Sequence, residues 1–451
     1  MPPHISVNQN KKIKMKLIFN QKLYDNFYNI IIFIPLLSFI TGFYLNENSA
    51  GMGDYAGDIN WIKKNIQIFL QNDLRDAIFH PDLFGNRPPL IYIINKLLNP
   101  FFNDFEKYRL IVFLISLIGP IIFYQSLKMR FNLIDKKILF LVSSLIYLSP
   151  YYRTSGFWGL NENYGIFTMF ITFFFLEKFN LEEKKFTNTL ALLIFSSLTV
   201  YFDQKFLFVP IVTFFSIMYS KNTLRNKLFV TIGYFILSVP YLYLLYRWNG
   251  IVPPATQLSN PKTITSISDL KFIYHIHAGY AATLISFYLL PIVLFTNSDL
   301  FKKIKGYFFL KKTYFYLILF LLFNFYNLFY FNFEQFTVTD YWVGLGVVHK
   351  LSLIATDQLF FQEILTYVFF FFSFIVLLFY FYENSYDGAL ISYFIFISLL
   401  LWPLMQEYFD PTILIIAFSL FKSVKNFNRI NSLIVFSYFS VFLLIANLHY
   451  S

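Results

Sequence analysis

Cysteine is absent from this chain of 451 residues, and charged residues are scarce at 14%. Without cysteine the chain has no disulfide, no thiolate nucleophile and no cysteine-ligated metal. Soluble domains carry about a quarter charged residues, whereas 57% of this sequence is hydrophobic and its mean hydropathy is +0.55. These proportions exclude an ordinary soluble protein and predict an all-α polytopic membrane protein.

Acidic residues are also in short supply. The 25 Asp and Glu face 36 Lys and Arg, which leaves a formal net charge of +11. In a soluble protein this excess would suggest a nucleic-acid partner, but here the positive-inside rule accounts for it and no nucleic acid is expected. The 63 Phe and 34 Tyr are interpreted as the base composition of an AT-rich genome and not as an aromatic binding surface.

Apolar runs between the basic segments predict about 11–13 transmembrane helices, the first of them over 27–45. The tail that precedes this run, residues 1–26, carries Lys11, Lys12, Lys14, Lys16 and Lys22. Because no small-residue cleavage site follows the run, we interpret it as a signal anchor with a cytoplasmic N-terminus. Alternation then places six segments outside, over 46–108, 153–162, 203–205, 247–272, 333–357 and 405–411.

The chain shows no soluble domain and no internal repeat. We expect residues 27–230, with the loop 46–108, to form one transmembrane module and residues 231–451 to add further transmembrane helices. The short loops on the expected cytoplasmic side hold most of the Lys and Arg, which supports this orientation. The expected location is the inner (plasma) membrane of a bacterium.

The first outer loop is the most informative stretch. Two acids, Asp54 and Asp58, stand among small residues directly after the first apolar run. The next segment places apolar side chains on one helical face and polar ones opposite, which is typical of a helix on a membrane surface. The apolar face holds Ile59, Ile62, Ile66, Phe69 and Leu70, and the polar face Lys63, Lys64 and Gln67. The stretch ends at Arg87-Pro88-Pro89-Leu90, a rigid turn beside a cation.

Charged residues expected on the outer side form a set, although each alone can be explained as a solvated charge. An Arg at a span edge can bind a phosphate through paired N–H donors, and a partly desolvated Asp can act as a general base. We predict phosphate contacts from Arg87 and Arg153, with Lys205 and Arg247 next in line. The set comprises Asp54, Asp58, Arg87, Arg153, Glu162, Asp203, Lys205, Arg247, Asp340, Glu407 and Asp410.

Two further patterns carry little weight. His275 and His277 lie two residues apart, so they face different sides of a helix and do not predict a metal site. Gly344 and Gly346 lack the strand–helix context of a dinucleotide loop. No metal-ligating residue is therefore predicted from the sequence.

Several of these motifs, in this order and on this side of the membrane, resemble the GT-C membrane glycosyltransferases. That family includes protein O-mannosyltransferases and the bacterial aminoarabinose transferase that acts on lipid A. The similar elements are Asp54-Tyr55, the helix after Asp58, Arg87-Pro88-Pro89-Leu90 and Tyr108-Arg109-Leu110. The resemblance is clearest over 50–180 and continues weakly at Trp248-Asn249-Gly250, Pro253-Pro254 and Gln406 to Pro411.

The resemblance implies that 27–230 is the catalytic module of an inverting glycosyltransferase. The donor would be a sugar on a polyprenyl phosphate at the outer face, and the acceptor a glycan, lipid or protein hydroxyl. Arg87, Arg153, Glu162, Lys205, Arg247 and Tyr408 are the expected substrate-binding residues. No cofactor is firmly implied, and a requirement for a divalent cation is left open.

The sequence departs from the family in the first loop. The usual Asp-Glu pair is absent, so Asp54 and Asp58 compete for the role of base, and Glu162 is the candidate for a second acid. We favour Asp54, because Gly51 and Gly53 before it allow a tight turn close to a substrate. Asp58 precedes the helix at Ile59, where an N-cap acid has a structural purpose.

Two other classes of membrane protein compete with this prediction. A flippase or transporter would use the same charges as a substrate path, but would carry acids near the middle of its spans, where Glu363 is the clearest example. A polysaccharide polymerase or ligase would place Arg and His in a large late loop, a role open to His349 and Lys350.

Overall fold

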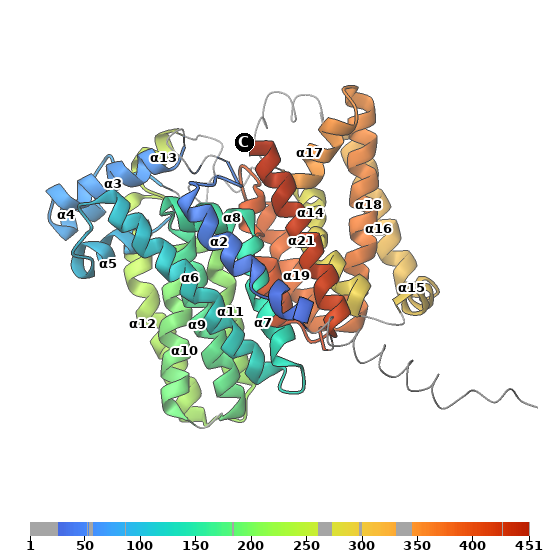
Figure 1. Cartoon of the computed structure of the whole chain (residues 1–451), viewed down its shortest axis with the longest axis horizontal. Coiled ribbons are helices and arrows are strands. Elements are labelled where there is room, and N and C mark those ends of the chain that lie inside the picture. Colours follow the sequence, from blue (N-terminus) through green and yellow to red (C-terminus); the bar gives the residue numbers. More distant parts are fainter. Residues whose placement is uncertain are drawn as a thin grey trace, which may run out of the picture.

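A computed structural model describes most of the chain, namely residues 26–51, 53, 57–85, 87–182, 185–259, 273–296, 300–330, 345–425 and 427–450. Within these residues the secondary structure is helical and contains no strand (Figure 1). The predicted fold class is confirmed: the chain is an all-α polytopic membrane protein.

Six helices in the described residues are long and apolar enough to cross a membrane. Their length follows from the rise of about 1.5 Å per residue and a hydrocarbon core of about 30 Å. They are Asn26–Tyr44, which ends in α2 (Ile34–Tyr44), α6 (Phe105–Arg130), α12 (Leu224–Trp248), α14 (His277–Thr296, apolar over His277–Leu294), α18 (Leu359–Glu383) and α21 (Arg429–Tyr450).

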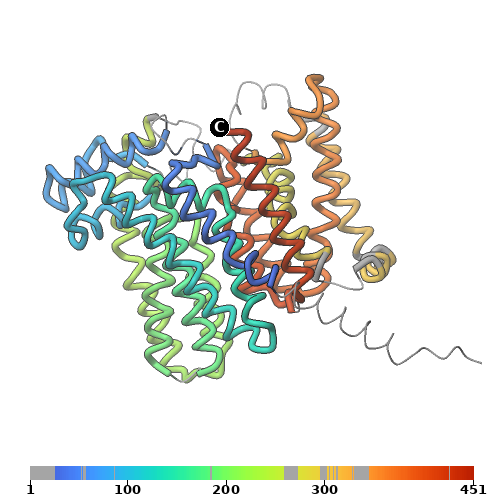
Figure 2. The backbone as a smooth tube through the Cα atoms, in the orientation of Figure 1, coloured from blue at the N-terminus to red at the C-terminus, as the bar shows by residue number. Residues whose placement is uncertain are grey.

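Other helices complete the bundle. Their bounds are α7 (Lys136–Ser144), α9 (Glu162–Leu181), α10 (Phe186–Phe202), α11 (Phe208–Tyr219), α16 (Lys311–Tyr330), α19 (Ser385–Ser398) and α20 (Thr412–Ser419). In Figures 1 and 2 the helices α6 and α9 to α12 form one half, and α14, α16, α18, α19 and α21 form the other. Small helices gather at one end of the bundle: α3 (Ile59–Gln71), α4 (Leu74–Ile78), α5 (Leu90–Leu98), α13 (Pro254–Ser259) and α17 (Gly346–Ala355). We call this the α3 end.

Ion pairs at the opposite end join the segments that the sequence predicts to be cytoplasmic. Arg429 pairs with Asp135 at 2.9 Å, and Arg130 pairs with Glu177 at 3.3 Å. Lys303 of α15 (Leu300–Phe308) pairs with Glu383 at 2.6 Å. In Figure 1 α15 lies far from α3, so the described loops fall into the two predicted groups. Which group faces the cytoplasm stays a prediction.

The first loop differs from the prediction in what its amphipathic helix covers. Helix α3 forms as expected, but its apolar face packs on α5 and the start of α6 and is not open to lipid. Phe69 lies 5.4 Å from the ring of Tyr92, and Ile62 and Ile66 are buried in the same cluster. Leu70, predicted for the same apolar face, is 44% exposed. The apolar face is thus covered by the loop's own second helix, and the position of α3 at a membrane surface stays a prediction.

A second difference lies at residues 150–158, where the sequence predicts the end of a span at Tyr151 and an outer loop over 153–162. They form α8 (Pro150–Trp158), because Ser149 accepts the backbone N–H of Tyr152 at 3.0 Å and Pro150 fits the first helical turn. Gly159 ends the helix with φ +77°, a conformation that favours glycine. As a result this segment is buried in the bundle.

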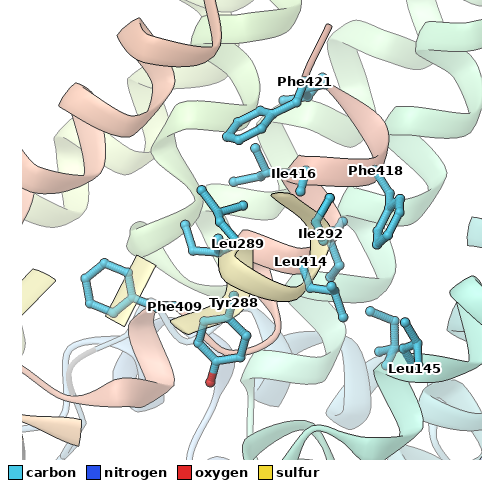
Figure 3. Close-up of a cluster of buried hydrophobic side chains, with 14 of the residues drawn as sticks. Leu145, Tyr288, Leu289, Ile292, Phe409, Leu414, Ile416, Phe418 and Phe421 are labelled. Carbon is cyan, nitrogen blue, oxygen red and sulfur yellow. The ribbon is translucent and has the colours of Figure 1, made fainter. Parts of the chain in front are cut away.

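A tightly packed cluster fixes the turn over 405–411 to the second half. Figure 3 shows Tyr288 and Leu289 of α14 beside Phe409 and Leu414, all buried. Each fully buried side chain of this kind contributes about 1.5–3 kcal/mol. Buried apolar residues before and after the polar residues of that turn, such as Leu404 and Leu414, therefore hold the turn in place.

The predicted orientation can be tested in the natural cysteine-free background. Single cysteines can replace two exposed residues, Asp73 directly before α4 and Lys305 in α15, and these two helices lie at opposite ends of the bundle (Figure 1). On intact cells a membrane-impermeant maleimide should label Asp73→Cys and should label Lys305→Cys only after permeabilisation. Labelling in the reverse order would place the loop 46–108 in the cytoplasm.

Candidate functional site

Arg87 lies at the meeting point of four chain segments at the α3 end. Its Nε donates to Oδ2 of Asp203 at 3.0 Å, and its Nη2 forms an ion pair with Glu162. Glu407 lies 3.9 Å from the same nitrogen. Glu162 begins α9, Asp203 follows α10, and Glu407 belongs to the 3-10 turn Gln406–Tyr408. The guanidinium thus joins acids far apart in sequence.

Lys205 completes the cationic side of this arrangement. Its Nζ lies 3.4 Å from Oδ2 of Asp203 and donates to the carbonyl oxygen of Glu407 at 3.3 Å. Burial raises the pKa of Asp203, but Lys205 and Arg87 outweigh it, so the pKa of this carboxyl ends below its ordinary value. Tyr408 is half-buried beside the same charges. We call Asp58, Arg87, Glu162, Asp203, Lys205, Glu407 and Tyr408 the Arg87 cluster.

Asp58 is a half-buried acid of the cluster, and its pKa is raised above the ordinary value of an aspartate. Burial raises its pKa to about 6; the charge of Arg87 lowers it and that of Glu162 raises it. The interpretation of Asp58 as a helix cap was wrong. Its side chain makes no capping hydrogen bond, and its backbone is helical (φ −61°, ψ −27°) instead of extended as a capping residue requires.

Two carboxyl groups of the turn over 405–411 titrate near neutral pH. Burial and the neighbouring charge of Glu162 raise the pKa of Glu407 to about 7. Burial likewise raises the pKa of Asp410 to about 7, and its Oδ2 accepts the backbone N–H of Tyr151 at 3.3 Å. The charge of this turn, at the border of the cluster, therefore changes with pH near neutrality.

The loop that carries Arg87 is fixed from two sides. The hydroxyl of Thr256, in α13, accepts the N–H of Gly85 at 2.9 Å and donates to its carbonyl at 3.1 Å. The rings of Trp61 and Phe84 stack with centroids 3.8 Å apart. On the other side Pro88 and Pro89 restrict the backbone as α5 begins. Because of these contacts Arg87 is presented by a rigid turn.

Arg153 lies outside the cluster. It is 1% exposed, and its guanidinium is held by Glu47 and by the backbone carbonyls of Tyr147 and Ser38. This ion pair joins α8 to the end of α2, so the structure gives Arg153 a packing role. The sequence placed Arg153 at the outer edge of a span, where it was expected to contact a phosphate, because the sequence did not predict α8.

Arg247 also lies away from the cluster. It is exposed at the end of α12, 4.6 Å from the ring of Phe79, and donates to Tyr243 at 3.2 Å. Asp54, Tyr55 and Asp340 fall outside the described residues, so their predicted roles are not tested. Of the other predicted site residues, Asp58, Arg87, Glu162, Lys205 and Tyr408 come together.

Sequence reasoning left Asp203 and Glu407 without a role, although both appeared among the outer charges. Only the fold shows that they flank Arg87. The guanidinium of Arg87 lies between Glu162, Asp203 and Glu407. Among the described residues no group of three His, Asp or Glu side chains could hold a metal ion. The arrangement can orient a carboxylate base and donate hydrogen bonds to oxygen atoms of a ligand.

Comparisons with known proteins find no family model that matches this chain, no similar curated protein and no similar solved structure. Function is therefore inferred from the chemistry of the Arg87 cluster together with the motifs that carry it.

The packing role of Arg153 predicts a loss of stability when its charge is removed. Breaking a buried ion pair on one side costs about 3–5 kcal/mol, so Arg153→Met should lower the melting temperature in detergent markedly. Arg247→Met, at an exposed site, serves as the matched control and should change stability by less than about 0.5 kcal/mol. A wild-type melting temperature for Arg153→Met would return Arg153 to the candidate substrate contacts.

Proposed function

We propose that this protein is a membrane glycosyltransferase that transfers a sugar from a polyprenyl-phosphate donor to an acceptor hydroxyl at the extracytoplasmic face. The observation that carries the proposal is Asp58, a half-buried carboxyl with a pKa of about 6 beside the anchored Arg87. A base with a pKa near the working pH combines ionisation with the ability to accept a proton.

The reaction can be written for the residues of the cluster. The ionised carboxylate of Asp58 takes the proton of the acceptor hydroxyl, and the oxygen attacks the anomeric carbon of the donor. A new carbon–oxygen bond forms as the bond from that carbon to the phosphate oxygen breaks, and the electron pair leaves with the phosphate. Attack from the side opposite the phosphate inverts the configuration of the anomeric carbon.

Arg87 supports this step through its position. Two of its nitrogens face Asp203 and Glu162, while Nη1 has no partner in the part of the chain that the structure describes. The side chain is 21% exposed, so Nη1 can donate to an oxygen atom of a bound sugar. Asp203 and Glu162 fix the plane of the guanidinium group, and this plane sets the direction in which the two N–H groups of Nη1 point.

The location of the cluster favours an enzyme over a transporter. The charges gather at the α3 end of the bundle, where a lipid phosphate would lie, and not near the middle of the spans, where transporters bind substrates. Loop helices α3 and α5 pack together beside the cluster at this end. A substrate with an apolar chain and a polar head suits this arrangement.

The choice between Asp58 and Asp54 is the sharpest test of the proposal. The capping role that made Asp58 the less favoured base is absent, so we assign the base to Asp58. With purified protein in liposomes and a synthetic polyprenyl-phosphate sugar, Asp58→Asn should lower turnover by ~10²–10⁴-fold. Asp54→Asn should retain turnover within about tenfold, since its carboxylate would only assist binding.

An inactive Asp54→Asn beside an active Asp58→Asn would restore Asp54 as the base. If the wild-type protein transfers no sugar from any polyprenyl-phosphate donor to glycan, lipid or protein acceptors, the proposed function is wrong.

The pH dependence follows from the same carboxyl. Asp58 must be ionised to accept a proton, and its pKa is about 6, so kcat/KM should rise with pH through about 6 and level off above it. Glu407→Gln is the control: it removes the neighbouring carboxyl with a pKa of about 7 and should keep the rise near 6. A profile that is flat from about one pH unit below 6 to about one unit above it would exclude Asp58 as the base.

A further inference from the structure

Lys350 is a cation at the α3 end that pairs with no Asp or Glu side chain among the described residues. It lies on α17, half-buried, and its Nζ donates to the hydroxyl of Tyr450. The same nitrogen lies 3.3 Å from Nε2 of His449 and 4.5 Å from the centre of the Tyr450 ring. Within the described ranges of the chain no Asp or Glu pairs with it.

Contacts of Tyr450 connect Lys350 to the first loop. A Cβ added to Gly51 would lie 2.5 Å from the Tyr450 ring, so the ring packs directly on this glycine. Gly51 has φ +70°, and both features exclude larger residues at this position. Tyr450 therefore contacts both Lys350 and Gly51, which belongs to the loop that leads to Asp58.

Tyr151 connects the same group to the Arg87 cluster. Its backbone N–H donates to Asp410, 3.3 Å away. Burial raises the pKa of its hydroxyl, and the charges of Tyr450, Glu407 and Asp410 raise it further, so this phenol lies within electrostatic range of all three. Polar groups that influence one another thus extend from Arg87 through Glu407 and Tyr151 to Tyr450.

Charge differs between the two ends of this set. Around Arg87 and Lys205 stand Asp58, Glu162, Asp203 and Glu407, so an added anion would meet more acids than cations there. Around Lys350 the partners in the part of the chain that the structure describes are the uncharged phenol of Tyr450 and the imidazole of His449. Coulombic attraction therefore favours an anion at Lys350 over one at the centre of the cluster.

We propose that Lys350 and Tyr450 form the subsite for the phosphate of the lipid-linked donor. This inference rests on the proposed function and assigns the leaving group to a place separate from the base. A lysine binds phosphate as a compact charge with three donors, and the Tyr450 hydroxyl can donate as a second ligand. The sugar would then lie between Lys350 and Asp58, with its anomeric carbon facing the acceptor.

The test measures binding, not transfer. Protein in phosphatidylcholine nanodiscs is titrated with a fluorescent polyprenyl phosphate and, in parallel, with the matching uncharged polyprenol. The wild-type protein should prefer the phosphate, and Lys350→Met should bind it about tenfold more weakly, as expected for one charge-assisted contact. Binding of the polyprenol should not change, and Lys350→Arg should keep the preference.

Two variants serve as controls. Lys305→Met removes an exposed cation at the opposite end and should bind like the wild type. Tyr450→Phe keeps the ring on Gly51 but removes the hydroxyl, and should weaken phosphate binding about threefold. It tests the subsite independently if Lys350→Met fails to fold, and unchanged binding in Tyr450→Phe and Lys350→Met would overturn the proposal.

Competition separates the sources of the phosphate. Excess polyprenyl phosphate should displace the probe, whereas phosphatidylglycerol or inorganic phosphate should not do so at the same concentration. Displacement by phosphatidylglycerol would make this a general headgroup site, and displacement by inorganic phosphate alone a free-anion site; each outcome rejects the donor assignment. Loss of binding in Lys350→Met without any sugar transfer by the wild type would retain the subsite and reject the glycosyltransferase.

Discussion

The ion pairs of Arg87 are the interaction on which the α3 end depends. One guanidinium holds Glu162, Asp203 and Glu407, which belong to the start of α9, the end of α10 and the turn before α20. These acids are nearly buried or half-buried, so each needs a cation, and removing one partner from such a group costs several kcal/mol. The same charges that close the end of the bundle also shape its polar site.

The turn over 405–411 connects this group to the second half of the molecule. Gln406 donates to the hydroxyl of Tyr288 at 2.8 Å and accepts the N–H of Val347 at 2.9 Å. One short segment therefore contacts α14, α17 and the Arg87 cluster. A ligand that binds across the cluster and Lys350 would contact both halves, which suits a donor whose phosphate and sugar must be held at a fixed distance.

The amphipathic helix in the first loop shows what a sequence pattern can predict and what it cannot. Its periodicity predicted the helix correctly, and α3 begins at Ile59 as expected. The same periodicity could not tell lipid from protein as the cover of the apolar face, because either surface buries the same side chains. Likewise, Arg153 read as a surface charge because its partner Glu47 lies 106 residues earlier in the chain.

Composition and hydropathy alone determined the membrane class, the order of the apolar helices and the grouping of loops into two ends. Those properties are local, since twenty apolar residues must bury themselves in lipid whatever their neighbours are. The tertiary structure decided which outer charges meet. Asp203 and Glu407 pair with Arg87, whereas Arg153 and Arg247 lie away from the cluster. Ion pairing depends on the distance in space between segments that can be hundreds of residues apart in the sequence.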